Sequence, residues 1–215
     1  MDDPKFVGDW CIQHREEIGT LHLLIHNAGL SMRELFMNTE IELGQRLLDV
    51  DFLSIFTMTK ELMPIMNTKD DGSVICGVGS LAGVVGPGVR SYYGGVKAAM
   101  DGFFKSLNCE TKPNNVHSMV IHLGYIKTNV SINALVGDGS SAFGKMDKNI
   151  EKGIKVRDCC NLMIDGINNR QVEVWICNTL FLKVLIYVGR LFKIIADKMI
   201  HKNVQEKLEA MKNSK

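Results

Sequence analysis

The sequence predicts an α/β fold, in which a doubly wound, Rossmann-like parallel sheet is covered by helices on both faces. Short stretches that are apolar at consecutive positions alternate along the chain with longer stretches of helical periodicity. A strand that is apolar at every position is buried on both faces, as in parallel sheets. The 215 residues, 46% of them hydrophobic, suffice for one domain with its own core.

Each expected element has its own signal. Asp3 and Pro4 form a cap and first-turn pair that predicts a helix ending at Gly19. Thr39 and Glu42 form a capping-box pattern that predicts a long helix ending near Met66. Two more helices are expected over 91–110 and around 156–169, and strands over 21–26, 73–78, 117–123 and 173–177.

The first expected strand, LHLLIH at 21–26, is as apolar as a strand in the middle of a sheet, yet only one helix precedes it. A bare hydrophobic edge promotes aggregation and is normally paired or blunted. We therefore expect the sheet to be open at this strand.

Charge and cysteine usage exclude several classes of function. A formal net charge of +1 gives no reason to expect nucleic-acid binding. The six cysteines include no CxxC pair and have no nearby pair of histidines, so we predict no metal site and reduced thiols. The opening MDDPKFVGDW is acidic and polar, unlike a signal peptide, and no run of eighteen uncharged apolar residues exists to span a membrane.

Tyr93 and Lys97 carry the chemistry that we predict. They lie four residues apart on an expected helix, and therefore on one face of it. Tyrosine, with a pKa of about 10, is a poor base at neutral pH, and a nearby ammonium lowers that pKa toward the range of a general acid/base. Ser80, thirteen residues before Tyr93, can hydrogen-bond a carbonyl or alcohol oxygen. The trio predicts proton transfer coupled to hydride exchange with a nicotinamide.

Four segments, in this order, resemble the short-chain dehydrogenase/reductase family: HNAG at 26–29, GSLAG at 79–83, YGGVK at 93–97 and LGYIKT at 123–128. The resemblance covers essentially the whole chain. It implies NADP or NAD as cofactor, and it assigns catalysis to Ser80, Tyr93 and Lys97, the last two also contacting the cofactor. The further cofactor contacts that it implies are Asn27, Ala28, Gly29, Gly124, Ile126 and Thr128.

The chain departs from the family pattern in three places. The opening strand and its glycine-rich TGxxxGIG turn, which brings the backbone close to the pyrophosphate, do not occur. We therefore expect a fold that lacks its first βαβ elements. Asp51 stands where the family has a catalytic Asn; its backbone carbonyl could still hold a relay water, but its carboxylate cannot donate a hydrogen bond and would perturb Lys97. Leu123 replaces a proline.

We expect two regions: a partial catalytic domain over 1–178, with a substrate lid over 131–146, and a tail over 179–215. In the tail, Thr179–Ile200 predicts an amphipathic helix with a cationic face, which either contacts a membrane interface or packs on its own domain or a partner. The resemblance to membrane-associated relatives favours membrane contact, at the endoplasmic reticulum; otherwise the protein is expected in the cytoplasm.

Two functions compete. The first is an NAD(P)-dependent oxidoreductase that interconverts a carbonyl and an alcohol on an apolar substrate such as a steroid or retinoid. The second is a shortened, non-catalytic member of the family that cannot hold a dinucleotide and acts as a membrane-associated interaction protein. The family also implies a homodimer formed through the long helices.

Overall fold

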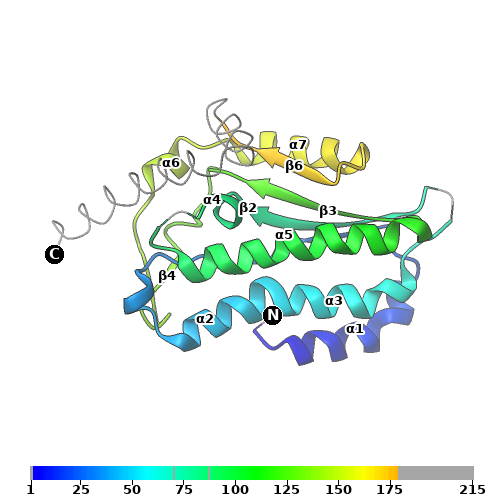
Figure 1. Ribbon diagram of the computed structural model, residues 1–215, viewed down its shortest axis with the longest axis horizontal. Helices are drawn as coiled ribbons and strands as arrows, with labels where there is room; N and C mark the ends of the chain where they lie inside the picture. Colours follow the sequence, from blue (N-terminus) through cyan, green and yellow to red (C-terminus); the bar gives the residue numbers. More distant parts are fainter. Residues whose placement is uncertain (1, 70, 87, 179–215) are drawn as a thin grey trace.

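The computed structural model describes residues 2–69, 71–86 and 88–178. Figure 1 shows a sheet with helices on both sides. Its four strands are all parallel and follow the order β1-β2-β3-β6. They are β1 (Leu23–His26), β2 (Ser73–Ser80), β3 (Val116–Leu123) and β6 (Glu173–Ile176). The α/β prediction is therefore confirmed.

The helices form layers on the two faces of this sheet. α5 (Ser91–Thr111) packs against β2 and β3, and α7 (Val156–Asn168) packs against β6. α1 (Pro4–Ile18) lies outside α3 (Ser54–Leu62), as Figure 1 shows. The shorter helices are α2 (Ile41–Leu48), α4 (Ala82–Val85) and α6 (Lys148–Glu151), with single 3-10 turns at Phe36–Asn38, Met63–Ile65 and Lys112–Asn114.

Alternation along β3 explains why that strand is apolar on consecutive positions. Val116 and Val120 pack with Phe104 of α5, whereas Met119 and Ile121 belong to the cluster that includes residues of α7. Successive side chains of a strand point to opposite faces, and both faces are covered here. The core is thus continuous through the centre of the sheet.

β1 differs from β3 because it has a neighbour on one side only among the described residues. Leu23 and Ile25 of β1 are 42% and 43% exposed. The open sheet expected at this strand is therefore present within the described part of the chain.

Two local expectations were wrong. The long helix is divided into α2, a π-helical turn at Asp49–Leu53 and α3. Its N-cap is Glu40, which makes no capping hydrogen bond with its side chain, and the Thr39 hydroxyl instead donates to the Leu35 carbonyl at 2.9 Å. The hydroxyl of Thr39 is therefore engaged by the preceding 3-10 turn and does not cap α2.

The expected lid at 131–146 contains a small antiparallel pair, β4 (Leu135–Val136) with β5 (Ser141–Ala142). The tail over 179–215, including the predicted amphipathic helix, lies outside the described residues. Within the described residues, every helix is too short or too polar to cross a membrane.

Candidate active site

A cavity of about 570 Å³ opens at the carboxyl ends of β2 and β3. Parallel strands end at the same edge of a sheet, so segments that follow different strands meet there. The cavity is lined by most of the residues singled out in the sequence: Asn27, Gly29, Ser80, Tyr93, Lys97, Gly124, Ile126 and Thr128. Ala28 is not among the lining residues, and Asp51 lies behind Lys97.

Ser80 is held close to the start of α5 by the short helix α4. The Ser80 hydroxyl oxygen accepts a hydrogen bond from the Ala82 backbone N–H at 3.1 Å. A Cβ atom at Gly83 would lie 2.6 Å from the Lys97 carbonyl carbon, so glycine lets α4 rest directly on the α5 backbone. This close approach puts the serine and the tyrosine–lysine turn on the same wall of the cavity.

Lys97 forms a buried ion pair with Asp51, which enters from the π-helical turn. The Lys97 Nζ and Asp51 Oδ2 atoms are 3.0 Å apart, and the two side chains are only 6% and 0% exposed. Asp51 Oδ1 also accepts a hydrogen bond from the Leu30 N–H at 2.6 Å. Burial raises the pKa of the Asp51 carboxyl, while Lys97 and the Leu30 N–H oppose that rise.

Besides Asp51, the Lys97 ammonium contacts the Met100 sulfur at 3.6 Å. It donates to the Val78 carbonyl at 3.4 Å and lies 5.8 Å from the centre of the Tyr93 ring. Positive charge is therefore present beside Tyr93, and Asp51 neutralises part of it.

Thr128 and the lid are tied down by local contacts. The Thr128 hydroxyl donates to the Ile126 carbonyl at 3.4 Å and accepts from the Val130 N–H at 3.3 Å. Arg33 pairs with Asp147, just past the lid, at 2.8 Å. Its guanidinium also lies 5.4 Å from the centre of the Phe143 ring within the lid.

Sequence reasoning missed the two arginines that line the cavity, Arg33 and Arg90. Neither belongs to a spacing pattern, although Arg90 immediately precedes α5 and Arg33 follows the HNAG segment by four residues. Burial lowers the pKa of Arg90, and the positive charge of Arg33 adds to that effect. No local signal in the sequence marks either side chain as facing the cavity.

The cavity residues fit the nicotinamide end of a dinucleotide. Hydroxyls from Ser80 and Tyr93 and the Lys97 ammonium converge there. A Cβ atom at Gly29 would come within 3.1 Å of Asp51, so glycine lets this segment pack closely against the Asp51 carboxylate. The residues before β1 form α1 and a short connection, and this stretch contains no glycine-rich turn for the phosphates.

A family model described as short chain dehydrogenase matches residues 1–136. The chain is 33% identical over 156 residues to dehydrogenase/reductase SDR family member 7B of Xenopus laevis, covering 73% of this chain and 48% of that protein. It is 30% identical over 174 residues to an SDR family protein 7-like of Anopheles gambiae, covering 81% and 54%. The chain thus spans about half the length of these curated relatives.

Solved structures share the fold at low sequence identity. A short-chain dehydrogenase from Sphingobium yanoikuyae in complex with NADPH superposes with a TM-score of 0.67 at 16% identity, covering 88% of this chain and 70% of that one. A short chain dehydrogenase/reductase from Burkholderia phymatum in complex with NAD gives 0.69 at 16% identity, covering 81% and 67%.

Proposed function

The chain belongs to the short-chain dehydrogenase/reductase family. On that premise we propose that it acts as an NAD(P)-dependent oxidoreductase that interconverts a carbonyl and an alcohol. The observation that carries the proposal is the convergence of Ser80, Tyr93 and Lys97 on one cavity. Solved relatives in complex with NADPH and with NAD support the choice of cofactor.

In this proposal each side chain has a separate task. Ser80 hydrogen-bonds the substrate oxygen, and Tyr93 moves a proton to or from that oxygen. Lys97 holds positive charge beside Tyr93 and binds the nicotinamide ribose. Asn27 and Ala28, with Gly29, lie toward the adenine side, whereas Gly124, Ile126 and Thr128 border the nicotinamide. The bound nicotinamide supplies or accepts the hydride.

Asp51 gives this site a feature of its own. Asp51, 3.0 Å from Nζ, takes one of the three N–H donors of the Lys97 ammonium, so a ribose hydroxyl would accept from another. We infer that Asp51 positions Lys97 and that its backbone, rather than its side chain, holds any relay water.

An apolar substrate is supported by the composition of the cavity wall. Much of that wall is aliphatic or sulfur-containing, with contributions from Leu81, Val85, Ile150, Val156 and Met163. Such a surface favours a steroid-like or retinoid-like body over a sugar. The segment over 131–146, tied to Arg33 through Phe143, is proposed as the lid over that substrate.

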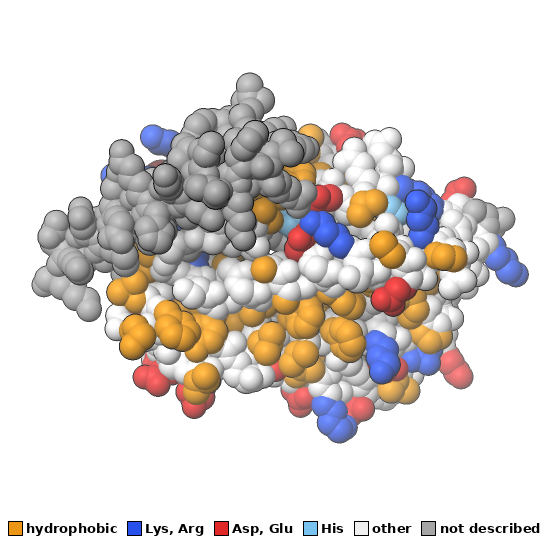
Figure 2. All heavy atoms as spheres, in the orientation of Figure 1, with side chains coloured by type: hydrophobic (Ala, Val, Ile, Leu, Met, Phe, Trp, Pro, Cys, Tyr) orange, Lys and Arg blue, Asp and Glu red, His pale blue; other side chains and the backbone are white. Residues whose placement is uncertain are grey.

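The remaining proposals concern partners. Figure 2 shows hydrophobic side chains gathered over α2, α3 and α5. Phe36, Ile41 and Phe56 in this region are 56%, 69% and 43% exposed, which supports a homodimer through this face. Residues 1–178 would form the catalytic unit, and 179–215 would hold it at a membrane interface of the endoplasmic reticulum.

The test compares two neighbouring tyrosines. The protein is prepared at its native length, established by intact mass, and NADPH and NADH oxidation is followed with hydrophobic ketones and aldehydes. Tyr93→Phe should lower kcat/KM by at least ~100-fold, because it removes the proton donor. Tyr92→Phe is the matched control, since Tyr92 packs against Gly44 and Phe36 away from the cavity.

Equal activity of Tyr93→Phe and Tyr92→Phe would overturn the catalytic assignment. If the native-length protein fails to bind either nucleotide, the non-catalytic interaction protein becomes the better account. Nucleotide binding with loss of turnover only in Tyr93→Phe would support the oxidoreductase.

A further inference from the structure

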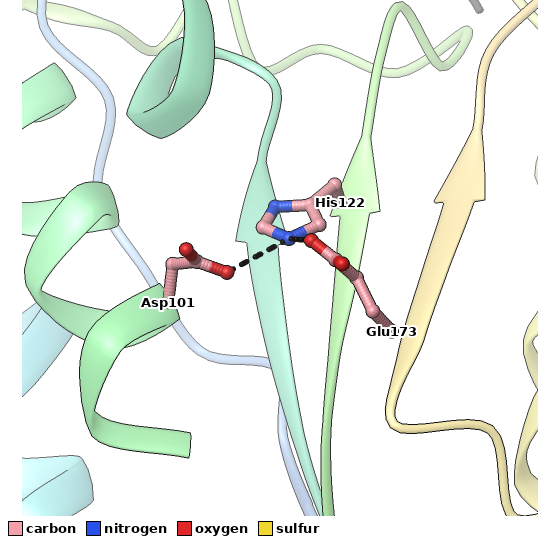
Figure 3. Close-up of side chains that lie close together, drawn as sticks. All are labelled: Asp101, His122 and Glu173. Atoms are coloured by element: carbon pink, nitrogen blue, oxygen red, sulfur yellow. Dashed lines mark hydrogen bonds and ion pairs between the residues drawn. The ribbon is translucent and has the colours of Figure 1, made fainter. Parts of the chain in front are cut away.

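Outside the cavity, three side chains that can bind metals converge where α5, β3 and β6 meet (Figure 3). They are Asp101, His122 and Glu173, and none of them lines the cavity. The His122 Nε2 atom lies 3.1 Å from Asp101 Oδ1 and 3.0 Å from Glu173 Oε1. The carboxylates approach the same ring nitrogen from two different elements.

A single proton on His122 cannot satisfy both carboxylates. The His122 side chain is 1% exposed, so its ring nitrogens depend on neighbouring side chains for hydrogen bonds. A neutral imidazole protonated at Nε2 has one N–H to donate, and Glu173 Oε1 is its hydrogen-bonded partner. Asp101 Oδ1 is buried and receives no hydrogen bond of acceptable geometry from His122, and its other close contact is the Lys105 ammonium.

The Lys105 ammonium already stands in a position suited to a cation. Its Nζ atom lies 2.7 Å from Asp101 Oδ1 and 3.1 Å from Glu173 Oε1. The Lys105 side chain is 33% exposed, so its ammonium can turn into solvent, and a metal ion would then balance the two carboxylates that it leaves. The two carboxylates therefore attract a positive charge, and a metal ion could replace the Lys105 ammonium beside them.

Ligand spacing is compatible with a metal ion, and ligand type favours a transition metal. Two ligands ~2.1 Å from one metal ion, at a tetrahedral or octahedral angle, are roughly 3.0 to 3.4 Å apart. The nitrogen-to-oxygen distances of 3.0 and 3.1 Å match that range. An imidazole nitrogen beside two carboxylate oxygens suits Zn²⁺, whereas Ca²⁺ and Mg²⁺ prefer oxygen ligands alone.

We propose that Asp101, His122 and Glu173 form a binding site for a divalent transition-metal ion of the Zn²⁺ type, which takes the place of Lys105. The Trp175 ring stacks on the imidazole, with ring centres 4.3 Å apart and planes inclined at 27°, and so restricts its rotation. Metal binding through Nε2 would place the proton of His122 on Nδ1, which is buried and has no hydrogen-bond partner among the described residues. The cysteine and histidine spacings that suggest zinc sites in a sequence do not occur here. These ligands come from positions 101, 122 and 173 and are collected only by folding.

Trp175 also provides the measurement. The chain has two tryptophans, so Trp10→Phe leaves Trp175 as the sole fluorophore of that kind. Replacing the exposed Cys109 and Cys160 by serine removes accessible thiols that bind metals. In this background Co²⁺ should quench Trp175 fluorescence with saturation, and Zn²⁺ should reverse the quenching. Zn²⁺ should also raise the melting temperature, because it binds the folded state.

Three variants separate a metal site from a structural charge cluster. Glu173→Gln should weaken Zn²⁺ binding at least ~10-fold, because it removes a charged ligand. His117→Gln should leave it unchanged, since His117 is a buried histidine of β3 that bonds the Gln171 carbonyl instead. Lys105→Met should tighten binding roughly 10-fold by removing the competing ammonium.

A gain of affinity in Lys105→Met cannot arise from misfolding. This variant therefore still tests the site if Glu173→Gln proves unstable. Absence of Zn²⁺ binding up to millimolar concentration in both the background protein and Lys105→Met would overturn the proposal. Binding that persists unchanged in Glu173→Gln would overturn it as well.

Discussion

Two lysines of α5, eight residues apart on one helix, are in opposite electrostatic situations. Lys97 is 6% exposed and faces one fully buried carboxylate, Asp51. Lys105 is 33% exposed and is shared by Asp101 and Glu173, with the buried His122 beside them. The first is a closed pair and the second is an open cluster.

The difference shows how desolvation decides what an ion pair does. Both partners of the closed pair are almost fully removed from water, so each depends on the other to offset the free energy of burying a charge. The ammonium of the open cluster can exchange the carboxylates for water at little cost. The same residue types thus restrict movement at Lys97 and permit replacement at Lys105.

The largest effect is expected when the buried carboxylate of Asp51 is removed from the Lys97 pair. Asp51→Ala should lower the free energy of unfolding by about 3 to 5 kcal/mol, because it leaves the Lys97 ammonium buried without its counter-ion. Urea denaturation measures the change. Asp49→Ala is the matched control, since among the described residues the Asp49 carboxylate accepts its side-chain hydrogen bond from the exposed Gln45 amide in α2. An equal loss in both variants would contradict the closed-pair account.

Acid titration extends the comparison to the histidines. Burial lowers the pKa of His26 to about 4, with no carboxylate opposing the shift, whereas two carboxylates oppose the fall at His122. Below pH 6.5 His26 is protonated in the unfolded chain but stays neutral in the folded protein until the pH approaches 4. Stability should therefore fall by about 3 kcal/mol between pH 6.5 and 4 and then level off with respect to this group.

Denaturation at a series of pH values checks this prediction. His26→Gln should flatten the slope in that window and retain a polar side chain opposite the Thr59 hydroxyl, 2.8 Å away in the native protein. His14→Gln, at a less buried position in α1, is the control. A slope that His26→Gln leaves intact would assign the acid sensitivity to other groups.

The smallest effect is expected at the open cluster. Lys105→Met should change the free energy of unfolding by about 1 kcal/mol or less in metal-free buffer, because its pairs are partly solvated. Calorimetry with a chelator present measures it. A loss as large as that of Asp51→Ala would mean that Lys105 is as dependent on its partners as Lys97.

Much of the fold could be predicted because its signals are local. The apolar stretches at 73–78 and 117–123 lie within β2 and β3, and Asp3 does cap α1 by accepting from the Phe6 N–H. The capping box at Thr39 was wrong because a competing turn lies just before it. Such competition between neighbouring turns is settled by packing, which the motif alone does not contain.

The candidate site could be predicted only in part. Ser80, Tyr93, Lys97 and Thr128 belong to segments with recognisable spacing, and the structure places them at one cavity, where their roles stay predictions. Arg33 and Arg90 carry no such spacing. Their place in the cavity wall depends on how the segments after β1 and before α5 turn.

By itself the sequence determined the alternation of strands and helices and the order of the family segments, because these depend on residues close together in the chain. Tertiary structure alone decided that Asp51 lies 3.0 Å from Lys97, and that Asp101, His122 and Glu173 meet. Contacts between distant residues depend on which faces are buried together. Burial then sets the strength of each charge interaction, and no spacing along a chain records it.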